Sequence, residues 1–368
     1  MSKVLTNVNR GGRKERSSNL ELYRVICMLL IVAHHFVVNS GLTSVGGPLA
    51  ENPTSANTLF LWLFGMWGKT GINCFLLITG YFMCKSTISI RKFIKFMLWI
   101  YLYKIVIFGI LLFCGYETLS VGRVAKLLMP VWGFNTNFTS CFIGFWLTIP
   151  FWNILIRNMT KKQHGLLLLL LLGMYSILGT IPSFNVAINY VTWFGVIYLV
   201  ASYIRLYPNE KWENTKLWGW LTCIFVMLAC FSAVCMQFIR SGSAMYFVSD
   251  SNKFFAVAVA VSSFLFFKNL NIPYNKLINI LGGASFGVLL IHANSDAMRQ
   301  WLWKDMVDCV GHYGLPLLQL IGYSVGVVLA IYAACAAIDY LRLKTIEEPF
   351  FRWYDKKSRF AKLQKILN

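Results

Sequence analysis

The stretch that sets the fold class of this chain is residues 18–40, SNLELYRVICMLLIVAHHFVVNS. Ser18 and Glu21 have the spacing of a capping box, which marks the start of a helix. Mostly apolar residues follow, over the roughly 20 residues that a helix needs to cross a bilayer. We expect a retained first membrane helix and not a cleaved secretory signal, because the stretch lacks a small-residue cleavage site and further apolar runs follow it.

Similar apolar runs recur as far as residue 341. Of the 368 residues 57% are hydrophobic and only 13% are charged, about half the charged fraction of a soluble protein. The sequence therefore predicts an all-α, polytopic integral membrane protein of about ten transmembrane helices. The expected spans are 20–40, 59–83, 93–115, 139–156, 164–181, 186–205, 217–239, 253–267, 277–294 and 315–341. The membrane domain is then 19–346, between a basic tail at 1–18 and a basic amphipathic tail at 347–368.

Positive charge predicts the orientation of these spans. Lys and Arg are frequent in both tails and after every second span, whereas the loop at 41–58 has none. By the positive-inside rule the basic segments, and therefore both termini, are cytoplasmic. Orientation and attraction to anionic lipid also explain the net charge of +20. We expect a cell-membrane protein whose partner is the lipid bilayer, with no nucleic acid as a partner.

The first expected helix carries a polar stripe. On an ideal helix Glu21, Arg24, His35 and Asn39 lie within about 60° of one another, while His34 points to a different face. Arg24 and His35 are three turns, or roughly 16 Å, apart along the helix axis. Because a charge in hydrocarbon is costly, ionisable residues within spans indicate a functional site beside a partner or a wet cavity.

The chemistry of the stripe leaves two readings of His35. Arginine near one end suits a phosphate, and a neutral imidazole near pH 7 accepts a proton from a hydroxyl. Alternatively, His35 only forms a hydrogen bond with a backbone carbonyl or another helix. No metal site is expected, because the five histidines lack ligand spacing apart from the adjacent pair His34 and His35.

Five motifs in this chain together resemble those of a known family. Residues 20–35, LELYRVICMLLIVAHH, resemble the opening helix of the acyltransferase 3 family of membrane O-acyltransferases, in which an acidic residue, an arginine and, eleven positions later, a histidine recur. Similar stretches follow in order across nearly the whole chain: GINCFLLITG at 71–80, FWLTIPFWN at 145–153, SFGVLLIH at 285–292 and EEP at 347–349.

One motif departs from the pattern of this family. Relatives usually have an Arg-x-x-Arg pair in the first cytoplasmic loop, where this chain has Arg91 followed by Lys92 and then Lys95. Lysine keeps the positive charge but loses the planar, two-pronged hydrogen bonding of arginine.

The resemblance implies transfer of an acyl group, most often acetyl, from cytoplasmic acyl-CoA to a hydroxyl of a cell-surface polysaccharide or its lipid-linked precursor. Acetyl-CoA is then the expected donor and co-substrate, a carbohydrate is the acceptor, and no cofactor is expected to stay bound. The resemblance implies catalytic roles for His35, Arg24 and Glu21, donor contacts for Arg24, Arg91, Lys92 and Lys95, acceptor contacts for His292, Asn39 and Ser285, and a bracing role for Glu347. Alternatively, Glu21 only forms a local ion pair with Arg24, Glu347 only pairs with the basic tail, and His292 only forms a hydrogen bond within the core.

Two questions stay open at this point. His35 either removes the proton of the acceptor hydroxyl or briefly carries the acyl group. A transporter or flippase that uses the polar stripe as a permeation path is the alternative function. The lack of a convincing internal repeat and the basic cytoplasmic loop, which suits an anionic cytosolic co-substrate, both favour the enzyme.

Overall fold

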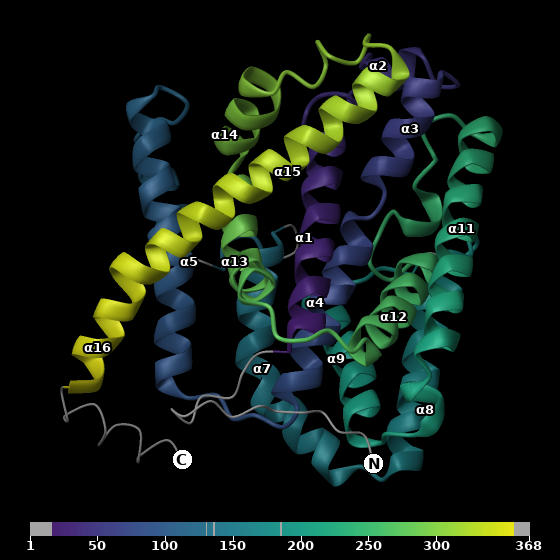
Figure 1. The fold of residues 1–368 in the computed structure, drawn as a ribbon, viewed down its shortest axis with the longest axis vertical. Helices are drawn as coiled ribbons and strands as arrows, with labels where there is room; N and C mark the ends of the chain where they lie inside the picture. Colours follow the sequence, from purple (N-terminus) through teal and green to yellow (C-terminus); the bar gives the residue numbers. More distant parts are fainter. Residues whose placement is uncertain (1–16, 130, 135–136, 185, 357–368) are drawn as a thin grey trace.

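The computed structural model describes residues 17–129, 131–134, 137–184 and 186–356, and these residues form helices with no strand (Figure 1). Most of the two basic tails, at 1–16 and 357–368, lies outside the described residues. The longer helices are α1 (Ser18–Val38), α3 (Ala56–Gly65), α4 (Gly68–Met83), α5 (Ile90–Phe113), α7 (Phe138–Asn158), α8 (Lys161–Leu172), α9 (Tyr190–Leu206), α11 (Thr215–Ile239), α12 (Phe254–Asn269), α13 (Lys276–His292) and α15 (Leu317–Arg342). Shorter elements are α2 (Pro48–Glu51), α6 (Val121–Leu128), α10 (Glu210–Glu213), α14 (Asp296–Arg299), α16 (Glu348–Lys356), the π-helical turns η1 (Gly173–Leu178), η3 (Gln300–Met306) and η4 (Leu343–Glu347), and the 3₁₀ turn η2 (Tyr246–Val248).

Every expected span coincides with a helix or a pair of helices, but fewer than ten are long and apolar enough to cross a membrane. Within the described residues six helices qualify, and a seventh does if α13 and the segment 296–306, which are bent by 96° to each other, count as one span. The apolar helices α9 and α12 have only 17 and 16 residues. At 1.5 Å per residue they measure roughly 25 Å, less than the ~30 Å hydrocarbon core. The cytoplasmic orientation of the termini stays a prediction.

The first helix, α1, lies at the centre of the bundle (Figure 1). It packs against α3, α4, α12, α13 and α15, while α5 and α11 lie at opposite sides of the bundle. The helix begins one residue earlier than the predicted capping box implies, and the box does not form: Ser17 is the N-cap residue, and the Ser18 hydroxyl accepts a hydrogen bond from the backbone of Asn275 at 2.9 Å. This bond joins the start of α1 to the start of α13.

Two glycines allow helices to approach α1 closely. At Gly282 of α13 an added Cβ atom would lie 2.6 Å from the backbone oxygen of Glu21. At Gly68, where α4 begins, a Cβ atom would lie 2.3 Å from Cγ of the His34 ring. Small residues at helix contacts are how membrane helices gain close packing without a hydrophobic driving force between them. These contacts hold α13 against α1 at Glu21 and α4 against α1 at His34, near the two ends of the polar stripe.

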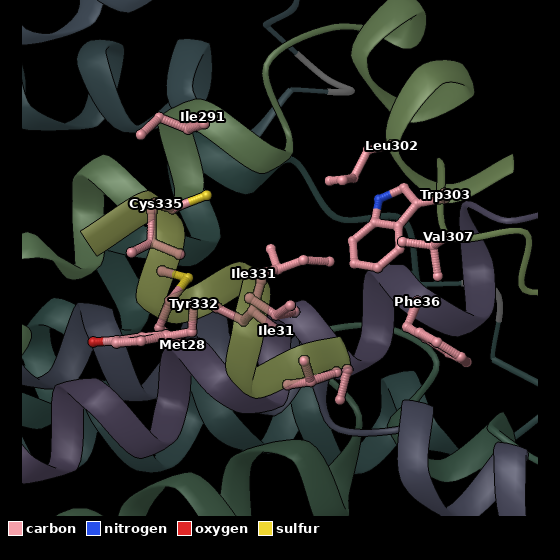
Figure 2. Packing of buried hydrophobic residues seen from close by; sticks show 14 of the residues in the cluster. Met28, Ile31, Phe36, Ile291, Leu302, Trp303, Val307, Ile331, Tyr332 and Cys335 are labelled. Carbon is pink, nitrogen blue, oxygen red and sulfur yellow. The ribbon is translucent and has the colours of Figure 1, made fainter. Parts of the chain in front are cut away.

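Apolar side chains fill the space between α1, α13 and α15. Figure 2 shows Met28 and Ile31 of α1 beside Ile331 and Tyr332 of α15, with Trp303 of η3 in the same cluster. All five side chains are buried. Met28 and Ile31 also line the cavity described below, so this packing holds α1 on the side that carries Arg24 and His35.

A buried ionic cluster joins α15 to α5. Arg342 donates hydrogen bonds to Asp339 at 2.9 Å and to Glu347 at 2.6 Å, and the three side chains are only 4–5% exposed. Glu347 also pairs with Lys95 of α5 at 2.6 Å, and Trp99 donates to Asp339 at 2.8 Å. The turn η4 carries Glu347 back toward Arg342. Every charge of the cluster thus has a partner, as burial of charge requires.

The substitution Gly282→Ala is expected to destabilise the protein by about 1–3 kcal/mol, because α1 and α13 must move apart to admit the methyl group. Gly109→Ala on α5 is the control, since nothing lies within 4 Å of a Cβ atom there. It should be neutral or slightly stabilising. Thermal unfolding in detergent measures both, and equal midpoints for the two variants would contradict the close contact.

Glu347→Gln is expected to lower the free energy of unfolding by about 3 kcal/mol, because buried Arg342 loses one of its two carboxylate partners. The adjacent Glu348→Gln is the matched control. Its ion pair with Lys344 has both side chains more than 40% exposed, so no measurable change is expected. Unfolding in mixed detergent micelles compares the two, and similar losses would argue against a stabilising cluster around Glu347.

Candidate functional site

A cavity of about 400 Å³ lies beside α1. Helices α4, α5, α7 and α13 contribute further walls. Its lining includes two histidines and four cations but no carboxylate: His34, His35, Arg24, Lys69, Lys104 and Arg299. Most of the remaining lining is apolar or aromatic, the usual composition of a small-molecule site. The charge favours an anionic ligand over a metal cation, and no group of three or more His, Cys, Asp or Glu residues in the described part of the chain is placed to hold a metal.

Two members of the polar stripe, Arg24 and His35, line this cavity together. Nη1 of Arg24 lies 2.6 Å from the carboxylate of Glu21, one turn earlier on α1. The Glu21 side chain is 5% exposed and does not line the cavity. A guanidinium has five donor hydrogens, so Arg24 can be held by Glu21 and still bind an anion.

His35 forms a hydrogen-bonded chain with His292 that links α1 to α13. Nδ1 of His35 lies 3.0 Å from Nε2 of His292, and Nδ1 of His292 lies 2.6 Å from the backbone oxygen of Val288. A carbonyl oxygen only accepts, so Nδ1 of His292 carries the proton. In the neutral ring Nε2 of His292 is then the acceptor, and Nδ1 of His35 must be the donor.

This chain of bonds assigns the tautomer of His35. Because Nδ1 carries the proton, Nε2 of the neutral ring has a lone pair. No hydrogen bond to this nitrogen is formed by any described residue. The His35 side chain lines the cavity, so a basic and nucleophilic nitrogen is available to a ligand there.

Of the three residues expected to contact the acceptor, one lines the cavity and two do not. Ser285 lines the cavity, with its hydroxyl 3.3 Å from that of Tyr332. His292 is fully buried behind His35 and does not line the cavity. Asn39 is the C-cap of α1 and lies outside the lining as well. His34, which was expected on another face, does line the cavity, while Nδ1 of its ring is bonded to the Gly65 carbonyl at 2.6 Å.

A second cavity of about 380 Å³ adjoins the first, because Trp99 and Gly283 line both. Its charged lining residues are Lys95, Lys276, Arg342, Lys344, Asp339 and Glu347. Cations therefore outnumber carboxylates by four to two in this lining. Glu347 lies at this cavity as the partner of Lys95 and Arg342, which is a bracing position.

Of the three cations expected in the first loop, only Lys95 reaches a cavity. Arg91 forms a two-pronged pair with Asp355 of α16, at 3.1 and 2.8 Å. Lys92 donates to the Ser86 hydroxyl at 2.6 Å and to the backbone of the preceding loop at 2.7 Å. Neither Arg91 nor Lys92 lines either cavity.

Three cations in the first cavity were not singled out from the sequence. Lys69 donates to the Tyr190 hydroxyl and lies 3.8 Å from Asp250, and Arg299 is paired with Asp296 at 2.8 Å. Lys104 has no hydrogen bond or ion pair with any described residue. Both lysines could have been identified from the sequence, because each falls within an expected span, where an ionisable residue indicates function.

Comparison with known proteins identifies the family. A family model described as an acyltransferase domain matches residues 17–338. The search of curated proteins and that of solved structures return no match. The family match runs from α1 into α15 and includes every lining residue of the cavity at His35. The chain therefore belongs to the acyltransferase 3 family, and it is a membrane acyltransferase.

Proposed function

We propose that this protein transfers an acetyl group from cytoplasmic acetyl-CoA to a hydroxyl of a cell-surface polysaccharide or its lipid-linked precursor. The observation that carries the proposal is the hydrogen-bonded chain from the Val288 carbonyl through His292 to His35. It leaves a basic nitrogen at a cavity whose charged residues are all cations. An anionic donor and a hydroxyl acceptor are the substrates that this combination suits.

The two adjoining cavities suit the two ends of acetyl-CoA. In the proposal the nucleotide phosphates occupy the second cavity, near Lys95 and Lys276. The pantetheine arm passes Trp99, which lines both cavities, and the thioester lies at His35. Arg24 binds the phosphate nearest the arm, about 16 Å along α1 from His35. Phosphate binding and chemistry are thus separated along one helix.

The transfer step uses Nε2 of His35. As a base, this nitrogen takes the proton of the acceptor hydroxyl while the oxygen attacks the thioester carbonyl. The carbon–oxygen bond forms, the carbon–sulfur bond breaks, and the proton passes from His35 to the leaving CoA thiolate. As a nucleophile, the same nitrogen attacks the thioester carbon and expels CoA thiolate. The acceptor hydroxyl then attacks the acetyl carbon, the bond from carbon to nitrogen breaks, and the hydroxyl proton passes to the thiolate. In both routes His292 stabilises the positive charge on His35, because Nε2 of His292 accepts a stronger, charge-assisted hydrogen bond from Nδ1–H of His35.

The central prediction concerns the two histidines of the chain. His35→Ala should reduce acetyl-CoA turnover by roughly 10²–10⁴-fold, because the only proposed proton acceptor is lost. His292→Leu should lower kcat and leave the KM for acetyl-CoA unchanged, because His35 loses its orienting partner. His292→Gln, whose amide oxygen can accept the His35 proton, should recover part of kcat. Thiol release from acetyl-CoA by the purified protein in detergent measures all three.

The control for this series is His164→Gln. His164 is also fully buried and also bonded to a backbone oxygen, that of Leu199 at 3.0 Å, but it does not line the cavity. This variant should keep its kcat. A His292→Leu protein with wild-type kcat would refute the orienting role, and an active His35→Ala protein would refute the proposed centre.

A further prediction separates the cations at the donor end. Arg24→Gln should raise the KM for acetyl-CoA roughly tenfold, the effect of about 1.4 kcal/mol of lost binding free energy. Lys92→Gln should leave it unaltered, because Lys92 bonds to its own loop and lines neither cavity. Steady-state kinetics on monodisperse protein measures the KM for acetyl-CoA of both variants. A raised KM in Lys92→Gln with an unaltered KM in Arg24→Gln would instead place the phosphate site at the loop beside Lys92.

A further inference from the structure

Lys104 is the one cation of the His35 cavity that has no counter-charge among the described residues. Lys69 has Asp250 and the Tyr190 hydroxyl, and Arg299 has Asp296. Lys104 lies in the middle of α5, an apolar helix of 24 residues, and its side chain is half-buried in the cavity wall. A lysine at such a depth without a partner costs free energy, which an anionic ligand would offset.

The proposed donor does not supply this negative charge. Lys95 of the same helix lines the second cavity, where the nucleotide phosphates of CoA are proposed to lie. Lys104 is nine residues further along α5, which is about 14 Å. The part of acetyl-CoA that reaches so far is the thioester end of the pantetheine arm, and it is uncharged. A negative charge that pairs with Lys104 would therefore have to come from the second substrate.

The aromatic lining of the cavity that holds Lys104 also suits a sugar. Phe142 lies between Phe138 and Phe286, with ring centroids 5.7 and 6.1 Å apart, and all three rings line the cavity. Such rings pack against the apolar faces of sugar rings. Thr139 and Asn294 line the same cavity and can hydrogen-bond to hydroxyl groups.

We infer that the acceptor is an anionic sugar, whose carboxylate or phosphate pairs with Lys104 while one of its hydroxyls lies at Nε2 of His35. The inference rests on the proposed function and adds the substrate class. A carboxylate would come from an acidic sugar, and a phosphate from a phosphorylated or lipid-linked one. The shared requirement is a negative charge on the molecule that accepts the acetyl group.

The test compares three acceptors that share the glucose ring: neutral methyl glucoside, methyl glucuronoside and glucose 1-phosphate. Purified protein, acetyl-CoA and each acceptor are incubated, and the alkali-labile acetyl ester is quantified by mass spectrometry. The wild-type protein should use one of the two anionic acceptors with a kcat/KM at least roughly tenfold above that of the neutral one. A higher value for the glucuronoside assigns a carboxylate, and a higher value for the phosphate assigns a phosphate.

Variants connect the preference to Lys104. Lys104→Met should reduce the anionic-to-neutral ratio to about one, and Lys104→Arg, which keeps the charge, should retain most of it. Lys126→Met removes a lysine from the short helix α6, which contributes to neither cavity, and should keep the wild-type ratio.

Three results would overturn the inference. The first is that the wild-type protein uses the anionic acceptors no better than the neutral one, or not at all. The second is that Lys104→Met keeps the wild-type anionic-to-neutral ratio of kcat/KM. The third is that Lys104→Met raises the KM for acetyl-CoA and leaves this ratio unaltered, which would place Lys104 at the donor. Consumption of acetyl-CoA with water as the acceptor is measured first. Its absence would count against the proposed function itself, whereas consumption without an anionic preference counts only against the acidic acceptor.

Discussion

The hydrogen bond between His35 and His292 is the contact on which the site depends, and it exists only because α1 and α13 run close together. Gly282 admits the backbone of Glu21 on one side of the contact, and the Ser18 hydroxyl joins the two helix starts. The bond from His292 to the Val288 carbonyl then fixes which nitrogen of each ring carries the proton. Packing between two helices thereby determines the protonation pattern at the cavity.

Features confined to one helix could be predicted from the sequence. The polar stripe of α1 and the position of Arg24 and His35 on one side of it follow from the helical repeat alone. The hydrogen bond between His292 and His35 could not be predicted in this way, because the two residues are 257 positions apart in the chain. Arg91 was likewise expected to contact a phosphate, yet its guanidinium is paired with the carboxylate of Asp355 in α16.

The expected count of ten spans is not confirmed, for a related reason. An apolar run shows that a segment avoids water, but not whether it is long enough or straight enough to cross the bilayer. α9 and α12 are short, and the chain bends by 96° after α13. The bend leads into α14 and η3, where Arg299 reaches the cavity and Trp303 enters the core. The bend after α13 thus supplies part of the site.

The neutral histidine chain has a consequence for how charge is distributed around the proposed reaction. Many hydrolases and transferases orient a catalytic histidine with a carboxylate. A carboxylate buried at position 292 would need a cation of its own, as Asp339 needs Arg342. The nearest cations line the cavity, and a carboxylate beside them would lower the net positive charge that an anionic substrate meets. A backbone carbonyl orients His292, and through it His35, without adding negative charge, so the cations of the cavity stay available to the ligands.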